Sequence, residues 1–402
     1  MEGNSAIIII SMVVLIYGHY SKLLLRFNIS GPMIFAGIGV LLSSLGLDVI
    51  KDASPDAEIV QITAEIALII VLFSDASALN LKRLRQEWTI PFRLLFIGLP
   101  ITIIFAAFMA KLIFPDEAFM YLLLMSLILA PTDAALGKAV VTDKKVPEKI
   151  RSSINVESGL NDGIVFPMLI TVAAIISAGQ AGDSSWLSFV AQQIIFGAVI
   201  GGSIGYLAAI VSKKAIEKNF IESGYKNLMP IALAIMAYYL SEHFGGNGFI
   251  SAFFTGLFLG NYNEHIRKNI EDFAESEGEL LILISFVIFG FVFIPATIEF
   301  WDFKVFLFAA LSLTVLRMIP VAISLIGTKF DLATVLFIGW FGPRGIASVL
   351  YVLIVVNSLH SIKGHEVIYS VITVTVLFSI ILHGLTAQPF SKLYGKTHND
   401  KD

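Results

Sequence analysis

The feature that most constrains this chain is a succession of long apolar runs that fills almost its whole length. Each run has about 17 to 25 residues, the length that crosses the bilayer core as a helix. Within a bilayer a chain can satisfy its backbone hydrogen bonds only as helices or as a closed barrel, and uninterrupted apolar runs fit helices. The sequence therefore predicts an all-α polytopic membrane protein.

The composition agrees with this class and excludes others. Hydrophobic residues make up 56% of the 402 residues and charged residues 14%, whereas soluble domains carry roughly 25% charged residues. The chain has no cysteine, which excludes disulfides and thiolate metal sites. A formal net charge of −4 provides no basic surface for nucleic acid. No HExxH pattern is present, so we expect neither an enzyme nor a bound cofactor.

The apolar runs define thirteen predicted spans. They lie near 6–25, 32–48, 59–79, 91–112, 118–141, 152–178, 187–211, 225–243, 248–260, 279–297, 303–326, 331–357 and 366–386. If the amino terminus is outside, most of the 27 Lys and Arg fall in inside loops, as the positive-inside rule requires. We expect a cytoplasmic (inner) membrane protein with its carboxyl terminus in the cytoplasm. The charged stretch 261–279 is expected as an amphipathic helix on the inner surface or as a solvated loop.

Two predicted spans contain a proline beside an ionisable residue. The fifth span reads APTDAAL, with Pro131 just before Thr132 and Asp133, and the twelfth reads FGPRGIA, with Pro343 just before Arg344. Proline removes a helical hydrogen bond, so we expect both spans to unwind there. Irregular backbone at that depth is tolerated only beside protein or a water cavity. A matched pair of interrupted spans indicates a transporter built from inverted repeats, whereas a single proline kink need have no function.

The sixth span carries a polar stripe. A helix that advances about 100° per residue puts Glu157, Ser158, Asn161 and Asp162 at about 0°, 100°, 40° and 140°. Their oxygen atoms are hard ligands suited to a partly dehydrated small cation, and the stripe offers no ligand that zinc or copper prefers. Polar residues that join helices by hydrogen bonds are the alternative.

Other charges lie deep in spans, where insertion costs roughly 2.5 to 3.5 kcal/mol. Arg317 on the eleventh span needs a buried anionic partner, and by elimination Glu157 is the best candidate, because Asp162 must stay free to exchange ligands. Lys138 is expected to reach the inner interface. Glu65 is consistent with either an entry funnel or simple helix contacts.

These motifs resemble those of a known family. APTDAAL, NVESGLNDG, TVLRMIPV and GPRGIAS are similar to the corresponding motifs of the bacterial sodium/proton antiporters, the first branch of the monovalent cation:proton antiporters. The resemblance covers about residues 6 to 390. It implies the sodium/proton antiporter fold, with about 13 transmembrane helices, inverted repeats and two unwound crossing helices.

The resemblance also implies a homodimer, in contact with membrane lipid, and a division of each protomer into domains. A dimerisation domain would comprise 1–90 and, with a linker helix, 181–300. A core ion-transport domain would comprise 91–180 and 301–402, the latter ending in a short cytoplasmic tail.

At the site, the resemblance implies that Asp162 binds cation and proton in turn. Ser158, Asp133 and the backbone near Thr132 would help bind the cation, expected as Na⁺, while Glu157 would pair with Arg317. Relatives with asparagine at the position of Asn161 tend to exchange one cation for one proton, so electroneutral exchange is expected.

The predicted function is secondary-active exchange of Na⁺ or Li⁺ for H⁺ by alternating access. A K⁺/H⁺ antiporter of the same fold is the main alternative, since the same ligands can hold a larger ion. A cation channel is a further alternative, because acidic residues and half-helices can also line a pore. The sequence does not separate Na⁺, Li⁺ and K⁺.

Overall fold

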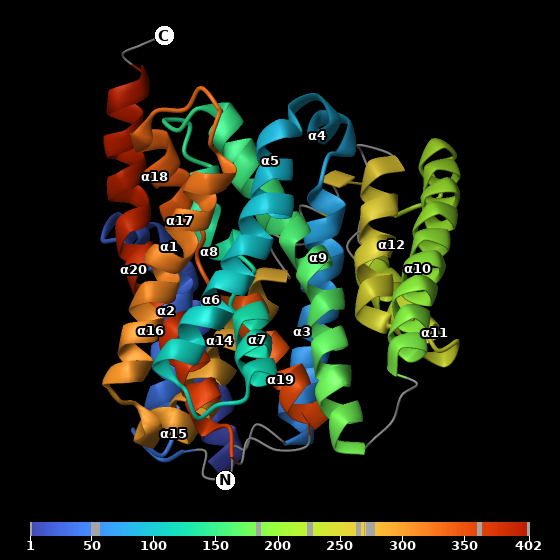
Figure 1. Cartoon of the computed structure of the whole chain (residues 1–402). Helices are drawn as coiled ribbons and strands as arrows, with labels where there is room; N and C mark the ends of the chain where they lie inside the picture. The colour runs from blue at the N-terminus through green and yellow to red at the C-terminus, as the bar shows by residue number, and fades with distance from the viewer. Residues whose placement is uncertain are drawn as a thin grey trace. The chain divides into compact units, whose positions relative to one another are not determined.

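The computed structural model describes residues 2–49, 57–181, 186–222, 228–262, 267–268, 270, 278–359 and 364–399. Every regular element in this part of the chain is a helix (Figure 1). One to three helical elements occupy each of the thirteen predicted ranges, which confirms the predicted fold class. Most of the charged stretch 261–279 lies outside the described residues.

The helices follow one another with short connections. Their bounds are α1 (Glu2–Arg26), α2 (Gly31–Leu42), α3 (Glu58–Ala78), α4 (Leu81–Glu87), α5 (Thr89–Arg93), the π-helical η1 (Leu94–Gly98), α6 (Leu99–Ile113), α7 (Phe119–Ile128), α8 (Ala134–Val141), α9 (Glu148–Ala181), α10 (Trp186–Glu217), α11 (Leu228–His243), α12 (Gly248–Tyr262), α14 (Glu279–Ile288), the π-helical η4 (Phe289–Phe293), α15 (Ile294–Thr297), the 3₁₀ turn η5 (Ile298–Phe300), α16 (Phe303–Leu313), α17 (Val315–Ser324), α18 (Leu332–Trp340), α19 (Ile346–Leu359) and α20 (Glu366–Asn399).

Eight helical stretches of the described residues are long and apolar enough to cross a membrane. They are Ile8–Arg26, Glu58–Ala78, Thr89–Ile113, Glu148–Ala178, Trp186–Glu217, Glu279–Phe300, Phe303–Ser324 and Glu366–Thr397. Other apolar helices are shorter, and two of them, α7 and α19, belong to predicted spans that are split in two. The splitting accounts for these two spans, whereas α2, α11 and α12 are unsplit helices of 12, 16 and 15 residues.

The chain divides into two compact units. Unit 1 comprises Met1–Ile62, Ile90–Ser158 and Ile282–Asp402, and unit 2 comprises Thr63–Thr89 and Gly159–Leu281. The helices α3, α5, α9 and α14 pass from one unit into the other. These units are defined by their compactness, whereas the predicted dimerisation and core domains are defined by function. The predicted division into those two domains therefore stays a prediction.

Two sets of elements follow the same order along the chain. In the first set, α5, η1 and α6 are followed by the split pair α7 and α8 and then by α9. In the second set, α16 and α17 are followed by the split pair α18 and α19 and then by α20. Both sets end in a helix of 34 residues. In Figure 1, α7 lies low in the view and α18 lies high, as expected for inverted repeats.

One interruption was not predicted. The eleventh predicted span is divided at Thr314, whose backbone (φ −116°, ψ −94°) separates α16 from α17. Pro320, inside α17, cannot donate the hydrogen bond that a continuous helix would need at that position. The division lies three residues before Arg317 and so sets the direction in which that side chain leaves its helix.

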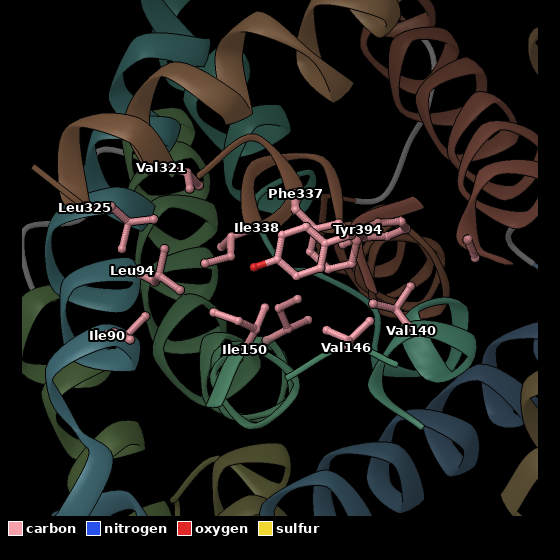
Figure 2. Packing of buried hydrophobic residues seen from close by; sticks show 13 residues of the cluster. Ile90, Leu94, Val140, Val146, Ile150, Val321, Leu325, Phe337, Ile338 and Tyr394 are labelled. Carbon is pink, nitrogen blue, oxygen red and sulfur yellow. The ribbon is translucent and has the colours of Figure 1, made fainter. Parts of the chain in front are cut away.

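An apolar cluster holds the short helices α8 and α18 in place (Figure 2). The ring of Tyr394, on α20, stacks on Phe337 with centroids 4.2 Å apart, and its hydroxyl lies 2.7 Å from Oγ1 of Thr334. Val140 of α8 belongs to the same cluster. The helix α20 continues past the predicted end at residue 386, and this continuation supplies Tyr394 to the cluster.

Glycines allow the closest helix contacts within each unit. In unit 1, a Cβ on Gly39 of α2 would lie 2.2 Å from the carbonyl oxygen of Val287. In unit 2, a Cβ on Gly201 of α10 would lie 2.2 Å from the carbonyl oxygen of Ser251 on α12. Residues 201–205, GGSIG, match the letters of a hydrolase nucleophile elbow, but they lie inside α10 instead of at a turn from strand to helix.

We predict that Gly39→Ala lowers the thermal stability of the detergent-solubilised protein. The added methyl group would collide with backbone, which cannot move aside as a flexible side chain can, so a loss of about 1 to 3 kcal/mol is expected. Gly37→Ala, on the same helix, is the matched control, because a Cβ there meets nothing within 4 Å. Equal melting curves for the two variants would contradict the close contact between α2 and α14.

Candidate functional site

The first interruption lies between α7 and α8, over residues 129–133. Pro131 has no amide hydrogen, and it disfavours helical backbone at the residue before it. Asp133 then caps α8, because its Oδ1 accepts a hydrogen bond from the amide of Leu136 at 3.1 Å. Its Oδ2 accepts a second one from the amide of Ile346 at 2.5 Å. One carboxylate therefore serves the amino-terminal ends of both α8 and α19.

The second interruption, between α18 and α19, lies directly against the first. The carbonyl oxygen of Pro343 accepts a hydrogen bond from the amide of Asp133 at 2.8 Å. A Cβ on Gly345 would lie 1.9 Å from Oδ2 of Asp133, so only glycine allows this approach. We call these two touching interruptions, residues 129–133 and 341–345, the crossing.

Arg344 complements Asp133 at the crossing. Its Nη1 donates to the carbonyl oxygen of Pro131 at 3.0 Å and also to that of Ala130. These carbonyls follow the carboxyl-terminal end of α7, where a positive charge is favourable. The amide of Arg344 donates to Oγ of Ser379 on α20 at 2.6 Å. Arg344 thus joins both interruptions to the last helix of the second set.

A buried ion pair connects α9 with α17. Nη1 of Arg317 lies 2.6 Å from Oε1 of Glu157, and Nη2 donates to Oε2 at 2.9 Å. The two residues are 1% and 2% exposed. Such a two-point pair is the strongest geometry available to a guanidinium and a carboxylate. A Cβ on Gly342 would lie 2.6 Å from Nε of Arg317, so the guanidinium packs directly on the second interruption.

Ser158 joins α9 to the first interruption. Its hydroxyl donates to the carbonyl oxygen of Thr132 at 2.6 Å. Unit 1 thereby brings together six of the predicted site residues, each at most 5% exposed. They are Thr132, Asp133, Glu157, Ser158, Arg317 and Arg344. Oxygen atoms, two cations and two anions are concentrated at one place in a membrane-spanning unit.

Asn161 and Asp162 continue the stripe along α9 and belong to unit 2, where they are 1% and 3% exposed. Asp162 lines a small pocket of unit 2. The other lining residues are apolar: Leu72, Gly163, Phe166, Pro167, Phe249, Ile250, Phe253 and Phe254. A Cβ on Gly163 would lie 2.3 Å from the ring of Phe253. The carboxylate therefore faces an aromatic pocket.

The sequence analysis did not identify three residues of this region, Ser348, Ser379 and His383. Ser348 donates from Oγ to the carbonyl oxygen of Ile128 at 2.7 Å, across the crossing. Ser379 accepts from Arg344, and His383, one turn further along α20, contacts both Ser379 and the carbonyl oxygen of Trp340. The sequence did contain a signal for Ser379 and His383, because they are four residues apart, as are Ser158 and Asp162.

The sequence singles out two further ionisable residues, Glu65 and Lys138. Glu65, on α3, accepts a hydrogen bond from the hydroxyl of Tyr239 at 3.0 Å, which agrees with a helix contact. Lys138 lies on α8, but its side chain is outside the described part of the chain.

Two split helices that cross at their interruptions, within repeated sets of helices, are typical of secondary transporters. The comparison with known families agrees with this class. The transmembrane model of the sodium/hydrogen exchangers matches residues 8–393, and the chain belongs to this family.

Individual relatives are more distant. The chain is 25% identical over 393 residues to the K⁺/H⁺ antiporter NhaP of Alkalimonas amylolytica, covering 97% of this chain and 67% of that one. It is 28% identical over 309 residues to the Na⁺/H⁺ antiporter of Schizosaccharomyces pombe, covering 69% and 65%. The chain thus spans about two thirds of the length of these relatives.

A solved structure has the same fold. The sodium proton antiporter MjNhaP1 from Methanocaldococcus jannaschii superposes with a TM-score of 0.79 at 20% identity, covering 98% of this chain and 100% of that one.

We predict that Arg317 and Glu157 are strongly coupled. Replacing either one with alanine leaves its partner charged, buried and unpaired, which should cost about 3 to 5 kcal/mol of unfolding free energy. The double replacement should cost much less than the sum, and thermal melts in detergent would measure this coupling.

A surface pair provides the matched control. Lys213 and Glu217 lie 3.9 Å apart on α10 and are largely exposed, so Lys213→Ala should cost less than about 1 kcal/mol. Strict additivity of the Arg317 and Glu157 replacements would show that the pair does not act as a unit.

Proposed function

We propose that this protein is a secondary-active antiporter that exchanges a monovalent cation for a proton. The observation that carries the proposal is the crossing, where buried carbonyl and carboxylate oxygens of unit 1 gather with the hydroxyl of Ser158 on α9. Membership of the sodium/hydrogen exchanger family supports the same activity. So do the relatives, which are named as K⁺/H⁺ and Na⁺/H⁺ antiporters.

Under this proposal the cation binds Asp162 together with Ser158 and the backbone near Thr132. Ser158 and Asp162 are four residues apart on α9, so they lie on neighbouring turns of one helix face. The hydroxyl of Ser158 donates to the carbonyl oxygen of Thr132, and both oxygens keep lone pairs for a cation. Hard oxygen ligands of this kind suit alkali-metal ions.

We assign Asp133 a mainly supporting part. Both of its carboxylate oxygens already accept hydrogen bonds from backbone amides. Each oxygen has a further lone pair, so Asp133 can still contact the cation. Its principal contribution is to hold Thr132 and Pro131 at a fixed place beside α9. Arg344 gives the complementary support from the second interruption.

Competition at Asp162 couples the two fluxes. The carboxylate holds either a proton or a cation, and in both states the group that moves is neutral. Without either ligand, a bare carboxylate would have to pass an apolar barrier, and burying an uncompensated charge is costly. The loaded states therefore cross the membrane readily and the empty state does not. This difference produces obligatory exchange.

We also infer the setting in which this happens. The protein would act as a homodimer in the cytoplasmic membrane, with its amino terminus outside and its carboxyl terminus inside. The dimerisation domain would comprise 1–90 and 181–300, and the core domain would comprise 91–180 and 301–402. Large apolar side chains exposed along α1 and α10, such as Leu15, Ile16, Val199 and Leu207, would face lipid or a second copy.

The direct test is exchange in liposomes that hold the purified protein and an imposed pH gradient, followed with a pH-sensitive dye. Addition of Na⁺, Li⁺ or K⁺ should collapse the gradient, and Asp162→Asn should abolish the response because no carboxylate remains to carry either ligand. Asp116→Asn, in an exposed loop, is the control and should exchange normally. Exchange by Asp162→Asn at the wild-type rate would refute competition at this residue.

The voltage dependence of the same assay tests the part assigned to Asn161. With Asn161 the exchange should run at equal rates when the membrane voltage is clamped at zero and at a negative value. Asn161→Asp should make the rate depend on voltage, since a second carboxylate can carry a further charge. A cation-dependent current through the wild-type protein without proton movement would favour a channel instead. The ion that restores dye fluorescence at the lowest concentration identifies the preferred cation.

A further inference from the structure

His383, on α20, is a buried histidine that the proposed exchange leaves without a part. It belongs to unit 1 and is 1% exposed. Its Nε2 lies 3.0 Å from the carbonyl oxygen of Trp340, the last residue of α18. Carbonyl oxygens face both ring nitrogens, Trp340 at Nε2 and Ser379 at Nδ1, and a neutral imidazole can donate to only one of them. We assign the proton to Nε2, because Nδ1 has the hydroxyl of Ser379 as a donor whereas Nε2 faces the carbonyl oxygen of Trp340. The end of α18 is thereby capped by a side chain from α20.

The other ring nitrogen reaches the far side of the same interruption. Nδ1 lies 3.1 Å from both the hydroxyl and the carbonyl oxygen of Ser379. With the proton on Nε2, Nδ1 accepts from the serine hydroxyl. The serine oxygen in turn accepts from the amide of Arg344 at 2.6 Å. A directed chain of hydrogen bonds thus runs from Arg344 through Ser379 and His383 to Trp340, and it closes over residues 341–343.

Two further contacts strengthen this arrangement. The indole Nε1 of Trp340 donates to Oγ1 of Thr386 at 3.0 Å, and its ring lies 5.2 Å from that of His383. At the other end, Arg344 holds the carbonyls of Ala130 and Pro131. The hydrogen bonds of His383 therefore extend, through Arg344, to the first interruption and the backbone before Thr132.

The two long helices hold their interruptions in corresponding ways. On α9, Ser158 bonds to residue 132 of the first interruption, and Asp162 follows four residues later. On α20, Ser379 bonds to residue 344 of the second interruption, and His383 follows four residues later. The position that holds a carboxylate in the first set of helices thus holds an imidazole in the second.

We propose that His383 is a positioning residue, the counterpart of Asp162 in the second set, and that it keeps the crossing in the geometry that binds the cation. It acts through Trp340 and Arg344 and does not itself touch the transported ion. The effect on transport rests on the proposed antiport activity, whereas the effect on the backbone at the crossing does not.

The test compares three replacements of His383. The amide nitrogen of Gln reaches the place of Nε2 and can still donate to Trp340, whereas Asn reaches only toward Ser379 and Ala reaches neither. In the liposome assay, His383→Ala and His383→Asn should raise the apparent KM for the cation about tenfold, as expected for one lost buried hydrogen bond. His383→Gln should restore an apparent KM close to the wild-type value. His19→Ala, at an exposed histidine of α1, is the control.

The split between KM and maximal rate separates positioning from general destabilisation. The proposal would be wrong if all three variants kept the wild-type KM and differed from the wild type only in a lower yield of folded protein. It would also be wrong if His383→Gln behaved like His383→Ala, because the bond to Trp340 would then not be the one that matters.

Hydrogen exchange measured by mass spectrometry gives a readout that does not need transport. Amides of residues 341–346 should exchange faster in His383→Ala than in the wild type, and His383→Gln should restore their protection. If the wild type moved no ions but showed this pattern, the proposed antiport would fail while the positioning role stood. Normal ion exchange with unchanged amide protection in all variants would overturn the positioning role alone.

Discussion

Backbone groups that lose their helical partners at membrane depth must find others within the protein, and the crossing depends on this requirement. Asp133 receives amides from the beginnings of two helices, α8 and α19. Arg344 covers carbonyls that follow the end of α7. Because Asp133 binds amides on both sides and the side chain of Arg344 binds the interruption opposite its own, the two irregular segments stabilise one another. An irregular, oxygen-rich surface can therefore exist where an ordinary helix would present only side chains.

Charge in unit 1 is balanced around that surface. Glu157 neutralises Arg317 at 2.6 Å, while Asp133 and Arg344 lie at helix ends whose partial charges are opposite to their own. The framework thus carries no net buried charge among these four residues. Under the proposed exchange, Asp162 adds one negative charge, which a bound cation or proton neutralises.

The sequence predicted the parts of this arrangement that have local causes. Proline marks both interruptions, because Pro131 and Pro343 cannot continue a helix, and the burial of Arg317 requires an anion. Other parts depend on partners far along the chain. The dual capping by Asp133 could not be foreseen, since Ile346 is 213 residues away. The division at Thr314 has no proline of its own, and His383 lies in an apolar run where a lone imidazole carries little signal.

The long sequence separations at the crossing have a consequence for biosynthesis. Residues 129–133 enter the membrane early, yet their partners Arg344 and Ile346 follow more than 200 residues later. Until the second set of helices is made, the unpaired carbonyl groups of the first interruption must form hydrogen bonds with water or with the insertion machinery. The contacts between the two interruptions can form only after synthesis has passed Ile346, so the first set of helices is made well before its crossing can close.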